Sequence, residues 1–87
     1  SSTNILTRIE RWIKRYKLDK EKPSGKLILK VHPMVFKTLR EGTISNMTKL
    51  SFKYLLRISL EEDPALAFQD FRFITAKTSE DITARYS

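Results

Sequence analysis

The sequence predicts a small α+β domain, in which a three-stranded, mostly antiparallel sheet is covered on one face by an N-terminal helix and a bent pair of helices. Three observations predict this fold. Apolar residues between Ile5 and Tyr16 recur at steps of three and four, the period of an amphipathic helix. The period changes to two over Lys26–His32 and again from Leu56, as in strands. The 87 residues are 40% hydrophobic and 31% charged and include no cysteine, which favours one folded domain without disulfides.

The N-terminal helix has its apolar stripe on one face and its arginines on the other. Ser2, Thr3 or Asn4 can accept hydrogen bonds from its first free amides, and Pro23-Ser24-Gly25 excludes its continuation. Trp12 lies on the stripe, so we interpret it as a core residue rather than a platform for stacking a base. The stripe consists of Ile5, Leu6, Ile9, Trp12, Ile13 and Tyr16.

The first strand and the helical pair follow the loop. Lys26–His32 alternates, with Leu27, Leu29 and Val31 on one face, and Pro33 ends the strand and suits the first turn of a helix. We expect that helix over Met34–Glu41, with Val35, Phe36 and Leu39 inward, and we expect Gly42 to close it in a left-handed conformation. Thr43 can start the second helix of the pair, whose inward residues are Ile44, Met47, Leu50 and Tyr54.

Two further strands complete the expected sheet. Leu56, Ile58 and Leu60 share one face of the second strand, and Phe68, Phe71 and Phe73 indicate a third strand over Asp70–Thr75. Because Asp63-Pro64 is a turn signal between them, we expect these last two strands to pair antiparallel. Residues 77–87 are polar and are expected to form a frayed tail, so the domain is expected to comprise residues 1–76. A small sheet with one open face and two edges favours pairing with another copy or another domain.

The positive charge is concentrated in the N-terminal part of the chain. Residues 1–40 carry eleven Lys or Arg and three acids, a balance of +8, whereas residues 41–87 carry six bases and seven acids, a balance of −1. A basic face of this kind can bind a polyanion, because Lys and Arg near phosphates release condensed counterions. The alternatives are a solvated face that maintains solubility and, more weakly, an acidic membrane surface. The candidate nucleic-acid-binding residues are Arg8, Arg11, Lys14, Arg15 and Lys26.

No constellation of catalytic or metal-binding residues is evident in the sequence. His32 is the only histidine and has no cysteine or acid at ligand spacing, so a structural role is favoured. Glu61-Glu62-Asp63 is interpreted as a solvated turn, since consecutive strand residues point to opposite faces. Two glycines exclude a phosphate-binding glycine-rich loop, and Phe71-Arg72-Phe73 lacks the glycine-rich surroundings of an RNA-stacking motif.

No apolar run is long enough for a membrane span and Ser1–Asn4 does not resemble a signal peptide, so we expect a soluble protein of the cytoplasm.

Several segments together resemble one protein family. They are Leu29-Lys30-Val31-His32-Pro33, then Val35 and Leu39, then Ile58 to Leu66, which includes Asp63-Pro64-Ala65-Leu66, and finally Gln69-Asp70-Phe71-Arg72-Phe73. This succession resembles the C-terminal small domain of the bacterial ribonuclease E/G endoribonucleases. The helix over residues 3–16 occupies the place of the helix that follows the zinc-binding link of that family.

The resemblance implies a non-catalytic role within a longer enzyme. In the family, RNA is cut by an upstream domain whose acidic residues hold magnesium, and cysteines of a link hold zinc; no residue here matches either set. The resemblance therefore implies no catalytic residue and no cofactor in these residues. It implies a cytoplasmic assembly domain near the RNA path of an RNA-processing enzyme, packed against other domains or subunits of a homo-oligomer. The alternative is a free-standing small basic nucleic-acid-binding protein, and an independent small hydrolase has no supporting constellation.

Overall fold

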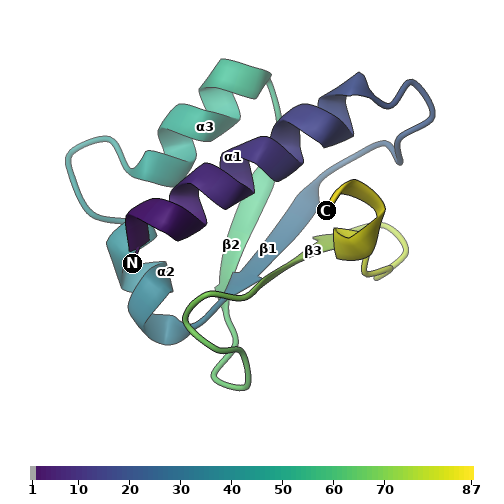
Figure 1. The fold of residues 1–87 in the computed structure, drawn as a ribbon. Helices are drawn as coiled ribbons and strands as arrows, with labels where there is room; N and C mark the ends of the chain where they lie inside the picture. The colour runs from purple at the N-terminus through teal and green to yellow at the C-terminus, as the bar shows by residue number, and fades with distance from the viewer. Residues whose placement is uncertain (1) are drawn as a thin grey trace.

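The computed structural model describes residues 2–87, with side chains described from residue 4 onward. It confirms the α+β fold, with helices on one side of a three-stranded sheet (Figure 1). The first helix begins at Ser2 and already includes Asn4, so Asn4 does not cap it, and the side chains of Ser2 and Thr3 lie outside the described residues. The elements are α1 (Ser2–Leu18), β1 (Leu27–Val31), α2 (Pro33–Leu39), α3 (Asn46–Tyr54), β2 (Ile58–Glu62), β3 (Phe71–Thr75) and the 3₁₀ turn η1 (Thr83–Tyr86).

The sheet is mixed, with the strand order β2-β1-β3. β1 pairs with β2 in parallel, from Leu27 opposite Ile58 to Val31 opposite Glu62, and with β3 antiparallel, from Leu27 opposite Thr75 to Val31 opposite Phe71. The expectation that β2 and β3 pair antiparallel is wrong, and the sheet is mixed rather than mostly antiparallel. The α2–α3 segment is long enough to act as the crossover that parallel pairing requires, which leaves β1 central.

The helical pair differs from the prediction at its second start. Ser45 caps α3 by accepting a hydrogen bond at Oγ from the amide of Thr48 at 3.1 Å, so the helix starts after Thr43. Ile44, predicted to face inward, therefore lies in the connecting loop and is exposed. Gly42 has the predicted left-handed conformation, with a φ of 95°, within this loop.

The hydrophobic core lies between the sheet and the helices, and α1 crosses in front of the sheet in Figure 1. Trp12 stacks on Phe73 with ring centres 3.7 Å apart, and its Nε1 donates to the carbonyl of Thr83 at 2.9 Å. Both rings are buried, as predicted from the apolar stripe and the aromatic strand. The buried cluster comprises Ile5, Ile9, Trp12, Ile13, Tyr16, Leu27, Leu29, Val31, Val35, Leu39, Met47, Phe73, Ile82 and Tyr86.

Residues 77–87 do not fray but pack onto this core. Ile82 and Tyr86 are buried, and the Ile82 amide donates to the carbonyl of Phe73 at 2.9 Å. The Thr83 hydroxyl accepts a hydrogen bond from the Phe73 amide at 2.8 Å. The expected boundary at residue 76 therefore does not separate a tail from the domain.

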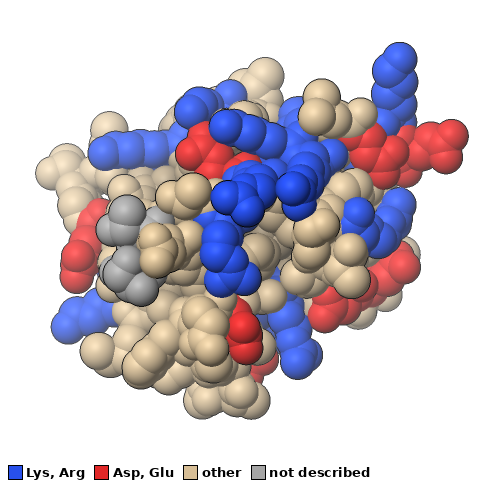
Figure 2. Space-filling view, viewed as in Figure 1, with Lys and Arg blue, Asp and Glu red and all other residues tan. Residues whose placement is uncertain are grey.

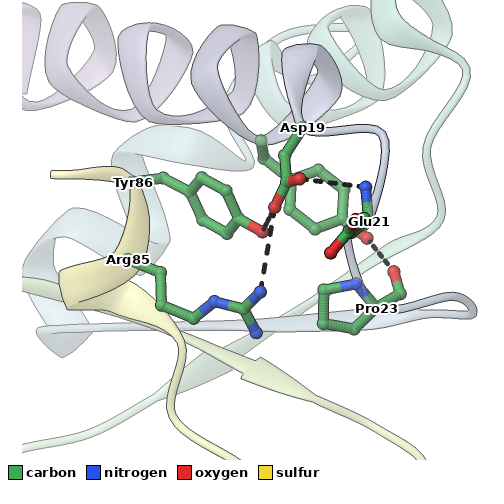
Figure 3. A network of polar contacts seen from close by, with 6 residues as sticks. Asp19, Glu21, Pro23, Arg85 and Tyr86 are labelled. Carbon is green, nitrogen blue, oxygen red and sulfur yellow. Dashed lines mark hydrogen bonds and ion pairs between the residues drawn. The ribbon is translucent and has the colours of Figure 1, made fainter.

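A polar network joins this last turn to the end of α1 (Figure 3). The Asp19 carboxylate accepts hydrogen bonds from the Tyr86 hydroxyl at 2.6 Å and from the Glu21 amide at 2.9 Å, and lies 3.7 Å from the Arg85 guanidinium. The Tyr16 hydroxyl donates to the Pro23 carbonyl at 2.6 Å. Burial, followed by the hydrogen bond to Asp19, raises the pKa of Tyr86 to about 12. The hydrogen bond from Tyr86 is the main cause of a lowered pKa of Asp19.

Replacing Phe73 by alanine should destabilise the domain by about 3–5 kcal/mol, because it removes a fully buried ring that Trp12 stacks upon. Denaturant unfolding monitored by Trp12 fluorescence measures the change. Phe52, which is 76% exposed, offers the matched control, and Phe52→Ala should stay within about 0.5 kcal/mol of the parent chain. Equal effects of the two substitutions would contradict the core assignment.

Alkaline pH should weaken the fold through Tyr86. The raised pKa means that the folded chain keeps the Tyr86 proton after the unfolded chain has lost it, so this contribution is complete below pH 10 and is lost as the pH rises towards 12. Thermal unfolding across this window, compared with Tyr86→Phe, should show a steeper loss for the parent chain. Absorbance of tyrosinate should lose a titration near pH 12 when Tyr86 is replaced by phenylalanine, and an unchanged titration in that variant would contradict the assignment.

Candidate nucleic-acid interface

The outer face of α1 carries a row of cations. Arg8, Arg11, Lys14 and Arg15 are exposed, while the apolar stripe of the same helix is buried against the sheet. Residues three and four apart on a helix lie about 5–6 Å from one another at their Cβ atoms, so these side chains form one surface. In Figure 2, which looks onto α1, Lys and Arg atoms gather over the helix. We call the set of Arg11, Lys14 and Arg15 the α1 basic face.

The side chains of the α1 basic face form no salt bridge or hydrogen bond within the part of the chain that the structure describes, although the charge of Lys14 acts on that of Glu10. The one acid of α1, Glu10, is engaged by α3 instead. Its Oε2 lies 2.8 Å from Lys53 Nζ and accepts a hydrogen bond from the Tyr54 hydroxyl at 2.6 Å. The hydrogen bond from Lys53, followed by that from Tyr54, lowers the pKa of Glu10. The Glu10 carboxylate is thus held by α3, and the arginines of the α1 basic face have no salt bridge within the described residues.

Arg8 differs from the other three cations because it is part of the fold. Its guanidinium donates to the Gln69 carbonyl and lies 5.3 Å from the centre of the Phe71 ring. These contacts fasten the N-terminal half of α1 to the loop before β3. Arg8 can still contribute positive potential, but its substitution would disturb packing as well as charge.

Lys26 lies apart from the α1 basic face. It precedes β1 and lines a groove with Arg40 and Arg57, and none of the α1 cations lines that groove. The structure therefore brings four of the five predicted binding residues together and places the fifth in another surface. The groove was not foreseen in the sequence, because its residues come from α2, α3 and β2 and only the tertiary fold assembles them.

The remaining candidate residues have local structural roles. His32 caps α2, since its Nδ1 accepts a hydrogen bond from the Met34 amide at 3.0 Å, and its ring meets that of Phe68 edge-on. Asp63 accepts a hydrogen bond from the Ala65 amide at 3.0 Å, as in a turn. Among residues 2–87, no three His, Cys, Asp or Glu side chains are grouped so that they could hold a metal ion.

Comparisons with protein-family models, with curated proteins and with solved structures find no match for this chain. Within the described residues, no helix combines the length and the apolar character that crossing a bilayer requires.

Proposed function

We propose that this domain binds RNA through the α1 basic face, as a non-catalytic assembly domain of a ribonuclease E/G-like endoribonuclease of the cytoplasm. The motif succession from Leu29 to Phe73 supports the family. The observation that supports the RNA contact is the exposed α1 basic face, on a helix whose one acid is hydrogen-bonded to α3. In this proposal the magnesium-dependent chemistry and the zinc link belong to other parts of the parent chain.

The α1 basic face is suited to a phosphate backbone rather than to base recognition. Arg11, Lys14 and Arg15 have freely exposed side chains, so they can follow a flexible backbone, and their exposure favours sequence-independent contact. The aromatic residues nearest in sequence, Trp12 and Tyr16, are buried and leave no stacking platform on this helix. Binding should therefore be electrostatic and strongly dependent on salt.

Assembly is assigned to the sheet face that the helices leave open. In the sheet register, Ile28 lies between Ser59 and Ile74, and the next residues on this face bring Lys30 between Glu61 and Arg72. These side chains alternate with the buried ones, so they point away from α1. Ile28 and Ile74 form an apolar pair bordered by charges of both signs. Such a surface can pack against another domain or subunit of the same enzyme, and the charges can fix the orientation of the partner.

RNA affinity should depend on Arg11, Lys14 and Arg15 together. Replacing all three by glutamine should weaken binding of a single-stranded RNA and reduce the slope of log K against log salt by about 2, because about three phosphate contacts are lost. Arg8 is left in place, since it supports the fold. Fluorescence anisotropy over a salt series measures both quantities.

The matched control for this experiment removes the same charge elsewhere. Lys37, Lys49 and Lys77 are exposed and lie outside both α1 and the open sheet face, and their joint replacement by glutamine should leave most of the slope unchanged. Equal losses in the two triple variants would show that net charge alone governs binding. An unchanged slope in the α1 variant would refute the RNA contact.

Self-association should depend on the open sheet face. Sedimentation of the chain at increasing concentration should show an oligomer, and Ile74→Glu should dissociate it by placing an unpaired charge within the apolar pair. Ile44→Glu, in an exposed loop residue, is the control and should leave the oligomer intact. A strict monomer at high concentration would contradict the assembly role.

A further inference from the structure

β2 is an edge strand whose outer side has no strand partner in the described sheet. On the β2 side, the Arg57 carbonyl accepts a hydrogen bond from the Leu27 amide, and the Asp63 amide donates to the Val31 carbonyl. The backbone groups of the odd-numbered residues between Arg57 and Asp63 therefore face β1. In a parallel ladder the alternate residues then point the other way. The amides and carbonyls of Ile58, Leu60 and Glu62 therefore face outward, as a template for another strand.

An apolar groove runs beside this free edge. It has a volume of about 750 Å³ and lies between β2 and the helices α2 and α3. Phe52 and Leu55 border it with 76% and 84% of their surface exposed, so large apolar side chains stand in solvent here. The apolar lining residues are Phe36, Met47, Phe52, Leu55, Leu56, Ile58 and Leu60.

Leu55 occupies a backbone position that does not suit leucine. It has a φ of 54° in the left-handed region and ends α3, where its amide donates to Phe52 and the Leu56 amide donates to Ser51. Glycine is the usual residue at this position of such a helix end, because a Cβ atom is strained there. The Leu55 side chain is 84% exposed, so its burial within the fold does not offset the strain at this position.

The charges around the groove specify the kind of partner. Lys26, Arg40 and Arg57 line it, and no Asp or Glu is among its lining residues. Arg40 also lies over the Phe36 ring at 5.2 Å, which holds its guanidinium beside the apolar floor. An apolar groove with a cationic rim complements an acidic segment with alternate apolar residues.

We propose that this groove binds an acidic, extended segment of a partner protein, which adds to the sheet as a strand beside β2. Backbone pairing with Ile58 and Leu60 supplies register, the groove takes alternate apolar side chains, and Arg40 and Arg57 select acidic neighbours. A nucleic acid has no backbone ladder to offer β2, and pairing of β2 with a second copy, whose own β2 carries Glu61 and Glu62, is the outcome that sedimentation of the chain alone would reveal. This site is separate from the α1 basic face and does not depend on the proposed RNA contact.

The test uses the full chain and a fluorescent peptide in which glutamate alternates with valine over the five-residue length of β2. The peptide should bind, whereas a lysine–valine peptide, and a glutamate–valine peptide N-methylated on the amides that face β2, should not. Arg40→Gln combined with Arg57→Gln should weaken binding about tenfold at low salt. Joint replacement of Arg11, Lys14 and Arg15 by glutamine should leave peptide binding unchanged, which separates this site from the RNA contact.

Leu55→Gly separates binding from folding. It should keep or raise the melting temperature, because glycine relieves the left-handed strain, and yet weaken peptide binding about fivefold or more. Leu55→Asn, which also tolerates this conformation, should behave in the same way. Unchanged affinity in both variants, or equal affinity for the N-methylated peptide, would overturn the proposal.

Two further outcomes would also overturn it. Displacement of the peptide by single-stranded RNA in the chain that lacks the α1 basic face would assign the groove to nucleic acid. Sedimentation of the chain alone as a dimer that Leu55→Gly dissociates would assign the groove to a second copy.

Discussion

The stacking of Trp12 on Phe73 is the contact on which the remaining arrangement depends. It joins the middle of α1 to β3 across the core, with ring centres 3.7 Å apart, and Tyr86 meets the Trp12 ring edge-on from the C-terminal turn. Because α1 is fixed by this contact along one face, its opposite face must point to solvent. The orientation of the arginines is thus a consequence of core packing and needs no separate device.

Polar contacts at the middle and at the C-terminal end of α1 maintain that orientation. Glu10 connects α1 to Lys53 and Tyr54 of α3, and Asp19 connects the end of α1 to Tyr86. Both carboxylates near the helix are therefore used to hold neighbouring elements. The α1 basic face has no salt bridge within the described residues, because the acids near α1 hold α3 and the C-terminal turn instead.

Local patterns predicted the elements well, and long-range pairing poorly. The alternation of Leu27, Leu29 and Val31 and the stripe of α1 are repeated over enough residues to define both period and face. The order of strands was wrong because a turn signal at Asp63-Pro64 says nothing about which strand the chain returns to, and β3 passes β2 to pair with β1. Ile82 and Tyr86 were too few to define a period, although both belong to the core.

The candidate sites were also predictable where local spacing defines them and not where the tertiary fold assembles them. Arg11, Lys14 and Arg15 belong to one helix, so their spacing alone brings them together, whereas Lys26 was grouped with them by charge and lies in another surface. The groove beside β2 depends on residues from three elements and on the left-handed backbone of Leu55, which no propensity indicates for leucine.

The central claim is that core packing of α1 presents its cations as the nucleic-acid surface. It is tested most directly by recording backbone amide resonances of the chain during titration with single-stranded RNA. We expect the largest shifts at the amides of Arg11, Lys14 and Arg15, with those of Ile58 and Leu60 unchanged. Shifts concentrated along β2 or on the open sheet face, with α1 unaffected, would contradict the claim.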